Sequence, residues 1–289
     1  MGSLSIYIRK ILKSNHHSEN IFRFLMRPYF ALGYAKSSLG AWLRKKGFSN
    51  PQKYQYLKKM KNSHKGERCF IIATGPSLTF EDLNLLRNEY TIGMNSGVYA
   101  IDKTMWVPDL LGLEDEYVYQ KLEPELIKQS EGKLKGRILV SNVIAKYFKS
   151  ARRFHVFPVN LLDHKYDFRK IGKLKFSDDC YSIVYDAYSI TFSLMQIAIY
   201  MGFKEIYLVG CDCTYNKAKA HFIETGVVDP YASQLGERFI YVHSKLKEFA
   251  DSKGVKIFNC TRGGMLEVYP RKNLEEVLVS LKKYTKDND

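Results

Sequence analysis

The amino-acid sequence predicts an α/β protein with a doubly wound, mostly parallel sheet. From residue 67 onward, short apolar runs without polar alternation lead into helical patterns, which is typical of parallel strands buried on both faces. Each apolar run stops in small or polar residues, as expected where a ligand crevice follows one edge of the sheet. A length of 289 residues suits one large α/β domain with an appendage, or two small domains.

The appendage is an N-terminal arm, residues 1–66, ahead of a body at residues 67–289. The arm holds 14 Lys and Arg and a single acid, Glu19, so it carries nearly all of the net charge of +15. Apolar residues recur in it at helical spacing, at Phe22, Leu25, Met26, Tyr29 and Phe30. A basic helix of this kind favours an anionic membrane surface over nucleic acid. A helical collar packed on the domain is the alternative. A membrane span is not expected, because Arg and Lys interrupt residues 21–43 too often.

In the first half of the body we expect five strands, over residues 69–73, 90–94, 106–113, 137–140 and 154–157. The second strand ends in Asn95-Ser96-Gly97, and the third ends in Glu114-Asp115-Glu116. A helix is expected from Thr79 to Arg87, because Glu81 and Asp82 in its first turn complement the helix dipole.

In the second half, two irregular segments, at about 158–187 and 213–235, are interpreted as lids. Between them, Ser189 and Thr191 precede an apolar helix at 192–201, where free amides suit a phosphate. A strand at 204–210 then delivers Cys211-Asp212-Cys213 to the same sheet edge. A helix at about 237–253, with His243-Ser244-Lys245 near its start, and a strand at 255–259 follow.

The turn Gly75-Pro76-Ser77 closes the first apolar run and is the strongest ligand-binding signal in the body. Such a turn stands at the carboxyl end of a buried strand, ahead of helix amides that attract an anion. A plain corner between strand and helix is the alternative. We expect an anionic ligand here because several other polar strand ends are predicted at the same edge.

The five Cys residues, at 69, 180, 211, 213 and 260, contain no Cys-x-x-Cys pair and no His at zinc-finger spacing. The sequence therefore predicts no metal site and a reducing compartment. We expect no secretory signal, because Arg9, Lys10 and Lys13 break the first apolar cluster.

Four segments, in order, resemble the bacterial sialyltransferases of glycosyltransferase family 42. They are Gly75-Pro-Ser-Leu78, Asn95, Gly202-Phe-Lys-Glu-Ile-Tyr-Leu-Val-Gly-Cys-Asp212 and His243-Ser244-Lys245. The first and last parts, especially Asn259-Cys-Thr-Arg-Gly-Gly-Met-Leu-Glu-Val-Tyr-Pro270, look more like a related Rossmann-like family that includes flagellin-glycosylation accessory factors and an archaeal pterin pyrophosphokinase. The resemblance covers about residues 67–282.

This resemblance implies a single Rossmann-like domain of the GT-A-variant type and inverting, metal-independent transfer from a CMP-sugar such as a CMP-nonulosonate. His243 would be the general base, with Tyr215 and Asp212 as further catalytic candidates. The expected donor-binding residues are Thr74, Gly75, Pro76, Ser77, Asn95, Ser96, Asp115, Ser189, Thr191, His221, Arg262 and Gly263.

The sequence also departs from the sialyltransferase pattern. Thr74 and the acidic residues 114–116 stand where those enzymes have Asn, Tyr215 lies one position off a tyrosine of theirs, and His221 falls near a second. Lys245 or Arg262 would supply positive charge, or would simply be solvated. These differences leave the sugar and the base of the nucleotide open.

Three hypotheses follow. The first is a glycosyltransferase acting on a surface-glycan or lipid-linked acceptor, in the cytoplasm and peripherally bound to the inner face of the cytoplasmic membrane through residues 1–66. The second is a pyrophosphokinase-type phosphotransferase that uses ATP and Mg²⁺, favoured only by the acids at 114–116 and Asp212. The third is a non-catalytic accessory protein. The sequence leaves a homo-oligomer open.

Overall fold

The computed structural model describes residues 16–147, 154–161, 174–214, 221–223 and 232–279. Contacts divide the chain into two compact units, residues 1–49 and 50–289. In the first, helix α2 runs from His16 to Lys45, which confirms the helix expected in the arm. Among the described residues, no helix combines the length and apolar character that crossing a bilayer requires.

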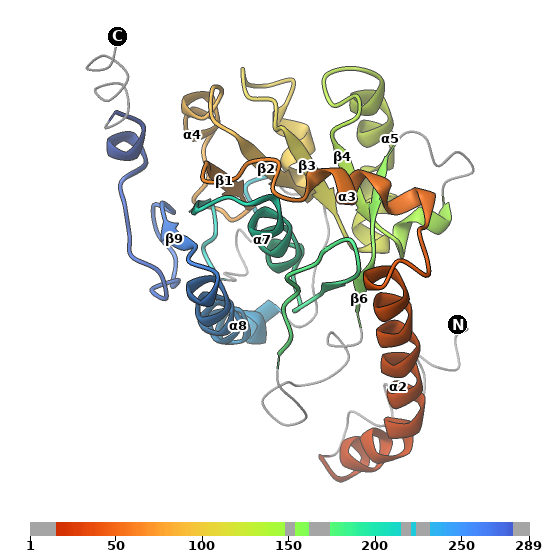
Figure 1. The fold of residues 1–289 in the computed structure, drawn as a ribbon. Coiled ribbons are helices and arrows are strands. Elements are labelled where there is room, and N and C mark those ends of the chain that lie inside the picture. Colours follow the sequence, from red (N-terminus) through yellow and green to blue (C-terminus); the bar gives the residue numbers. More distant parts are fainter. Residues whose placement is uncertain (1–15, 148–153, 162–173, 215–220, 224–231, 280–289) are drawn as a thin grey trace. The chain divides into compact units, whose positions relative to one another are not determined.

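The second unit is built on a seven-stranded parallel sheet in the order β5-β4-β3-β2-β1-β8-β9 (Figure 1). The strands are β1 Arg68–Ile72, β2 Thr91–Met94, β3 Leu110–Leu113, β4 Ile138–Ser141, β5 His155–Phe157, β8 Glu205–Val209 and β9 Lys256–Asn259. Every pairing in this sheet is parallel. The predicted doubly wound α/β fold, Rossmann-like in its order, is therefore confirmed.

Strand β1 marks the point where the order of the sheet reverses. The chain winds outward from β1 through β2 to β5, then returns to place β8 on the other side of β1. Phe70 of β1 thus lies opposite both Thr91 of β2 and Tyr207 of β8. A ligand crevice is expected where two such halves diverge, at the carboxyl ends of these strands.

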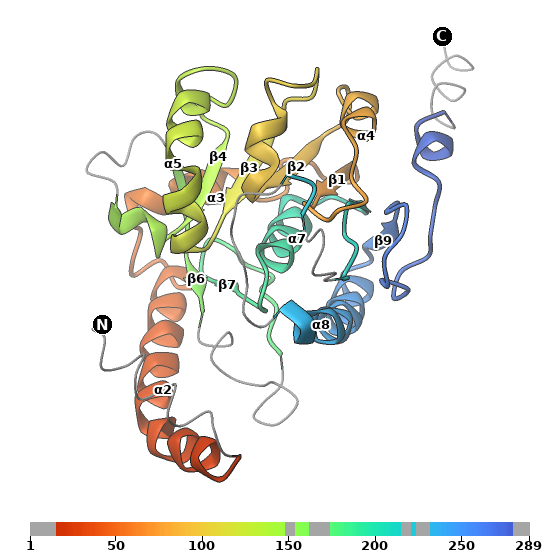
Figure 2. The ribbon, with the colours of Figure 1, turned by 180° about the vertical axis from the view of Figure 1, so that it is seen from behind.

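The helices of this unit include α3 Gln55–Met60, α4 Phe80–Leu85, α5 Glu116–Glu131, α7 Ile190–Met201 and α8 Ala232–Ser252, with short 3₁₀ turns η1 Gln52–Tyr54, η2 Asn95–Ala100 and η3 Ile144–Tyr147. Helix α7 packs across β1, β2 and β3, and α8 lies beside α7 and β9 (Figures 1 and 2). Gly202, at φ 97°, ends α7 in the left-handed conformation that favours glycine.

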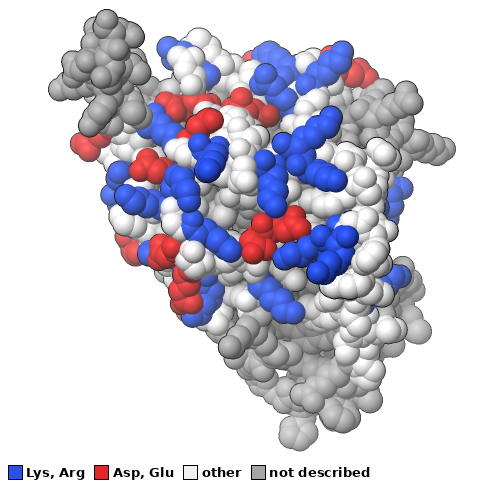
Figure 3. Space-filling model, viewed as in Figure 1, with Lys and Arg blue, Asp and Glu red and all other residues white. Residues whose placement is uncertain are grey.

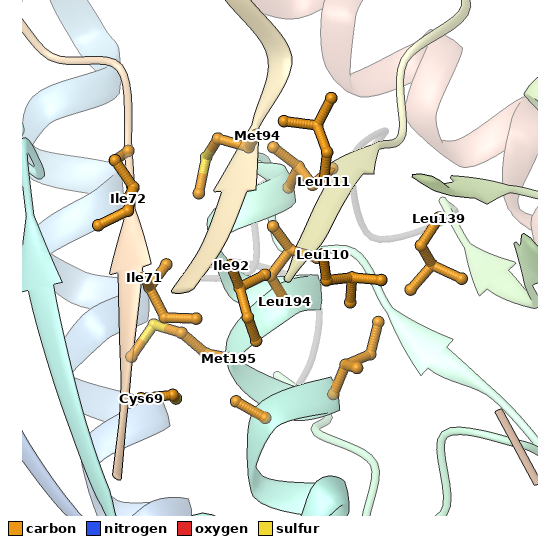
Figure 4. Close-up of a cluster of buried hydrophobic side chains, with 14 of the residues drawn as sticks. Cys69, Ile71, Ile72, Ile92, Met94, Leu110, Leu111, Leu139, Leu194 and Met195 are labelled. Carbon is orange, nitrogen blue, oxygen red and sulfur yellow. The ribbon is translucent and has the colours of Figure 1, made fainter. Parts of the chain in front are cut away.

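Part of the buried core lies between the sheet and α7, and further buried side chains come from α4, α5 and α8. Side chains of β1, β2 and β3 lie around Leu194 and Met195 of α7, and Leu139 of β4 extends the same cluster (Figure 4). Gly112 of β3 lets α7 approach, because a Cβ there would lie 2.6 Å from a methyl carbon of Leu194. On the face shown in Figure 3, Asp and Glu are interspersed among Lys and Arg.

Residues 50–66, which the sequence analysis assigned to the arm, belong instead to the second unit. Tyr54, Leu57 and Met60 are buried in its core. The backbone amides of Asn62 and His64 donate to the carbonyls of Tyr200 and Met201, at 3.1 and 2.9 Å. The predicted boundary was wrong because Lys residues on the exposed side of this segment made it look like more of the basic arm.

The first predicted lid, 158–187, is ordered core in its described parts. Strands β6 Val159–Asn160 and β7 Val184–Tyr185 pair in parallel, and Cys180, Ile183 and Val184 are buried. Residues 162–173 lie outside the described residues, as do 215–220 and 224–231 of the second predicted lid. Helix α8 begins at Ala232, earlier than expected, so His243 lies in the middle of the helix rather than near its start.

Candidate functional site

A pocket of about 120 Å³ lies at the carboxyl ends of β1, β2 and β8, where the strand order reverses. We call it the switch-point pocket. Typical small-molecule sites measure roughly 300–1,000 Å³, so this volume accommodates one ring or one phosphate of a larger ligand. It is lined by Ala73, Thr74, Gly75, Met94, Asn95, Ser189, Thr191, Phe192, Gly210, Cys211, Asp212, Cys213, Thr214, His221, Phe239 and His243.

The turn after β1 is locked to the end of β8. The amide of Gly75 donates to the carbonyl of Gly210 at 2.9 Å, and the Ser77 hydroxyl donates to Asp212 Oδ2 at 2.9 Å. A Cβ on Gly75 would lie 2.0 Å from that Asp212 oxygen, so only glycine allows this approach. Burial raises the pKa of Asp212, while the Ser77 hydrogen bond opposes the shift. Asp212 therefore holds the turn in place.

The N-terminus of α7 opens into the same pocket. The Ser189 hydroxyl accepts from the Thr191 amide at 3.3 Å and caps the helix. The Thr191 hydroxyl in turn contacts Met94 Sδ at 3.4 Å. On the opposite wall Asn95, at φ 45°, begins η2 in a left-handed conformation. A helix N-terminus facing a pocket favours an anionic group such as a phosphate.

His221 lines the pocket, and a backbone hydrogen bond of the next residue, Phe222, holds it there. The amide of Phe222 donates to the Thr74 carbonyl at 2.9 Å, and the ring of Phe222 packs edge-on against Phe80. This contact docks the short segment 221–223 on the turn after β1 and sets His221 among the lining residues.

His243 is 1% exposed and lines the pocket from α8. Its Nδ1 lies 3.0 Å from the Tyr269 hydroxyl, which itself donates to the His243 carbonyl at 3.1 Å. Burial raises the pKa of Tyr269 well above its usual value, so the hydroxyl keeps its proton. Because that proton goes to the carbonyl, Nδ1–H donates to the tyrosine oxygen, and Nε2 is the nitrogen that carries the lone pair.

Two thiols share the pocket wall with this imidazole. Cys211 Sγ lies 3.6 Å from His243 Nε2, and one ligand atom each from Cys211, Cys213 and His243 lie within 4.8 Å of one another. Hydrogen bonding from Cys211, with help from His243, lowers the pKa of Cys213 to about 6, whereas that of Cys211 is raised. This cluster was not predicted from the sequence, because Cys211 and Cys213 lie beyond the end of β8, where Cys213 has φ 54°, and His243 comes from the distant helix α8.

Several predicted site residues lie elsewhere. Arg262 pairs with Asp82 at 2.7 Å and Glu275 at 2.5 Å, and the Gly263 carbonyl accepts from Arg271 at 3.1 Å. Lys245 pairs with Glu248. None of these residues lines the switch-point pocket as the structure describes it. Arg262 was expected in the pocket because β9 ends at the same sheet edge. Its side chain is instead paired with Asp82, which could not be foreseen because Asp82 is far away in the sequence.

The acidic residues after β3 also have structural partners. Asp115 caps α5 by accepting from the amides of Tyr117 and Val118, at 2.8 and 2.9 Å. Glu114 is buried and accepts from the Ser193 hydroxyl. Pro76, Ser77 and Ser96 do not line the described pocket, and Tyr215 lies outside the described residues.

Comparison with known proteins gives a family, and solved structures of which two are described below. The family model described as 6-hydroxymethylpterin diphosphokinase MptE-like matches residues 45–218. Among curated proteins, none matches the chain significantly.

The MAf glycosyltransferase from Magnetospirillum magneticum AMB-1 is 15% identical, with a TM-score of 0.47, over 78% of this chain and 38% of that one. The sialyltransferase CstII from Campylobacter jejuni, solved with a substrate analogue, cytidine-5'-monophosphate, is 13% identical, with a TM-score of 0.43, over 72% of this chain and 85% of that one. This chain thus spans well under half the length of the first structure.

Proposed function

The chain belongs to the 6-hydroxymethylpterin diphosphokinase MptE-like family, and from this we propose a transferase that moves a group from a nucleotide donor to an acceptor hydroxyl. One observation carries the proposal. The N-terminus of α7, which suits the donor phosphate, and His243, whose Nε2 carries a lone pair and faces the Cys211 thiol, line the same switch-point pocket. Such transfer needs a base for the acceptor hydroxyl and fixed hydrogen-bond donors for the charge on the leaving phosphate.

The donor we propose is a nucleotide sugar. Among the described residues that line the pocket, Asp212 is the only carboxylate, and it already accepts from Ser77. Mg²⁺ is usually held through carboxylates together with the phosphates, so this lining supports a reaction that needs no Mg²⁺. The resemblance of Gly75–Leu78 and His243–Lys245 to sialyltransferases supports a CMP-nonulosonate, with sugar transfer that inverts the anomeric centre.

In this reaction the hydroxyls of Ser189 and Thr191, at the positive end of the α7 dipole, hold the departing nucleotide phosphate. His243 Nε2 takes the proton from the acceptor hydroxyl as the new glycosidic bond forms. Tyr269 is a positioning residue, because it fixes which imidazole nitrogen carries the proton.

A second candidate is transfer of diphosphate from ATP to a pterin hydroxymethyl group, which the description of the family favours. The same His243 would deprotonate the acceptor, but this reaction uses Mg²⁺ to neutralise the phosphates. The acids that the sequence analysis assigned to Mg²⁺ have other partners, since Asp115 caps α5 and Glu114 is buried beside Ser193.

Thermal shift with CMP, CDP, UDP, GDP and ATP, each with and without Mg²⁺, separates these candidates. Stabilisation by CMP without metal supports sugar transfer. A response only to ATP with Mg²⁺ would replace it with diphosphate transfer. If no nucleotide raises the melting temperature, both proposals fail and a non-catalytic accessory role remains.

The base is tested with His243→Gln, whose amide keeps a donor toward Tyr269. We expect nucleotide-induced stabilisation to persist while the transfer rate falls by about 10²–10⁴-fold, the usual contribution of a general base. The companion variant Tyr269→Phe should give a smaller loss and move the pH profile of kcat, because both imidazole tautomers become populated. Unchanged turnover in His243→Gln would remove this residue from the mechanism.

We further propose that residues 1–49 attach the protein to an anionic membrane surface, at the cytoplasmic face where a lipid-linked acceptor would lie. Leu32, Leu39 and Trp42 of α2 are 70%, 57% and 50% exposed, on a helix that also carries Lys36, Arg44 and Lys45. Apolar side chains among bases are the composition that binds an anionic bilayer surface.

A further inference from the structure

We propose that Cys211, Cys213 and His243 form a binding site for a soft divalent cation, Zn²⁺, on the wall of the switch-point pocket. Thiolate sulfur and imidazole nitrogen are the ligands that Zn²⁺ prefers in proteins. All three residues are buried, and their ligand atoms lie within 4.8 Å of one another.

The distances suit a tetrahedral ion. With Zn–S of about 2.3 Å and Zn–N of about 2.0–2.1 Å, the sulfur-to-nitrogen edge of a tetrahedron is about 3.5 Å. The observed separation of Cys211 Sγ and His243 Nε2 is 3.6 Å. Side-chain shifts of about 1 Å are enough to bring the two sulfurs to the roughly 3.8 Å edge that the same geometry requires.

The surroundings hold these ligands as a metal site requires. His243 donates from Nδ1 to Tyr269, which turns the Nε2 lone pair toward Cys211, and such second-sphere hydrogen bonds usually accompany metal-binding histidines. The Cys211 amide donates to Thr261 Oγ1 at 2.9 Å, and the Asp212 carbonyl accepts from the Met265 amide at 2.8 Å. The backbone that carries both thiols is therefore fixed from the β9 side.

Three protein ligands leave the fourth tetrahedral position to a water or to a ligand in the pocket. The carboxylate of Asp212 is not part of this cluster, and its Oδ2 accepts from Ser77. An ion here would occupy the Nε2 lone pair of His243. If the proposed function holds, Zn²⁺ and the acceptor proton therefore compete for the same atom, and Zn²⁺ inhibits transfer.

The test is a titration of the full-length protein with Co²⁺ in the presence of a phosphine reductant, followed by displacement with Zn²⁺. We expect a sulfur-to-cobalt charge-transfer band and visible bands of tetrahedral intensity that saturate at one ion per chain. Cys211→Ser and Cys213→Ser should each lose part of the charge-transfer band, and the double variant should lose all of it. Cys180→Ser and Cys260→Ser are matched controls, buried thiols outside the cluster, and should keep the wild-type spectrum.

Tyr269→Phe adds a second readout, because loss of a second-sphere partner should weaken Zn²⁺ binding by about 10–100-fold. Absence of the sulfur-to-cobalt band, or an equal band in the double cysteine variant, would overturn the site. The spectrum does not depend on turnover. If the cobalt band appears but no transfer activity is found, the metal site is supported and the proposed function is not. If the protein transfers without metal and shows no cobalt band, the proposed function is supported and the metal site is not.

Discussion

At the scale of single residues, Glu114 is a carboxylic acid buried beside a second one, Asp186. Burial, and then the charge of Asp186, raise the pKa of Glu114 well above its usual 4.5, although the hydrogen bond from Ser193 opposes the shift. A carboxyl group in this setting keeps its proton at pH values where it would be ionised in the unfolded chain. The folded protein therefore binds a proton that the unfolded chain releases.

This proton makes stability depend on pH. Because the pKa of Glu114 is higher in the folded state, its contribution is fully present below pH 4.5 and is lost as the pH rises toward the folded-state value. Glu114→Gln, which keeps an oxygen for Ser193 and stays neutral, should flatten the decline in unfolding free energy above pH 4.5. Urea denaturation across this range measures it. Glu81→Gln, an exposed acid in α4, is the control, and equal slopes for wild type and Glu114→Gln would contradict the prediction.

At the scale of elements, the turn after β1 and the end of β8 lie so close together that a side chain at Gly75 would overlap the end of β8. In Gly75→Ala the new Cβ would lie 2.0 Å from Asp212 Oδ2 and 2.5 Å from the Gly210 carbonyl. We expect a loss of about 1–3 kcal/mol in unfolding free energy, the usual cost of overpacking. Nucleotide-induced stabilisation should disappear too, because the turn lines the pocket.

The matched control is Gly263→Ala, since a Cβ at that position meets nothing within 4 Å. Its unfolding free energy should stay within about 0.5 kcal/mol of wild type. Denaturant midpoints and thermal shift with the stabilising nucleotide measure both effects. A Gly75→Ala protein that still responds to nucleotide would show that the turn has no part in binding.

The strands were predictable because parallel strands buried on both faces appear as unbroken apolar runs, as in Cys69–Ile72. Their termini also set Gly75, Asn95 and Asp212 on one edge of the sheet, which the sequence revealed. The partners of those side chains were not predictable, because they come from distant parts of the chain. Arg262 pairs with Asp82, and His243 contacts Tyr269, although the partners are far apart in the sequence and no local sequence pattern links them.

Helix α5 and the pair β6 and β7 escaped prediction for a related reason. Glu116–Glu131 contains Pro124 and many charges, so its apolar face is narrow. The strands Val159–Asn160 and Val184–Tyr185 are only two residues long each. Their burial comes from tertiary packing, which a short stretch of sequence does not reveal.

At the scale of the whole molecule, the boundary between the two units lies after Ser49, not after residue 66. A protein that begins at residue 50 should fold with near-native stability, because it keeps Tyr54, Leu57 and Met60 in the core. One that begins at residue 67 should be much less stable, since removal of a single large buried side chain costs about 2–5 kcal/mol. Circular dichroism and thermal melting compare the two proteins.

The same truncation tests the proposed membrane surface. The full-length protein should sediment with vesicles rich in anionic lipid, less so at high salt, and the protein that begins at residue 50 should stay in the supernatant. Neutral vesicles serve as the control. Continued sedimentation of the folded, truncated protein would place the membrane contact in the second unit instead.

The central position of β1 also bears on how the protein is made. Its ladder with β8 joins Arg68–Ile72 to Glu205–Val209, and at about 5–20 residues per second the ribosome needs on the order of ten seconds to make the chain between them. Through that interval one side of an apolar strand has no partner, and an unpaired strand of this kind templates aggregation. The nascent chain, more than the finished protein, is therefore where chaperones should matter, and slowing translation before β8 should lower the soluble yield.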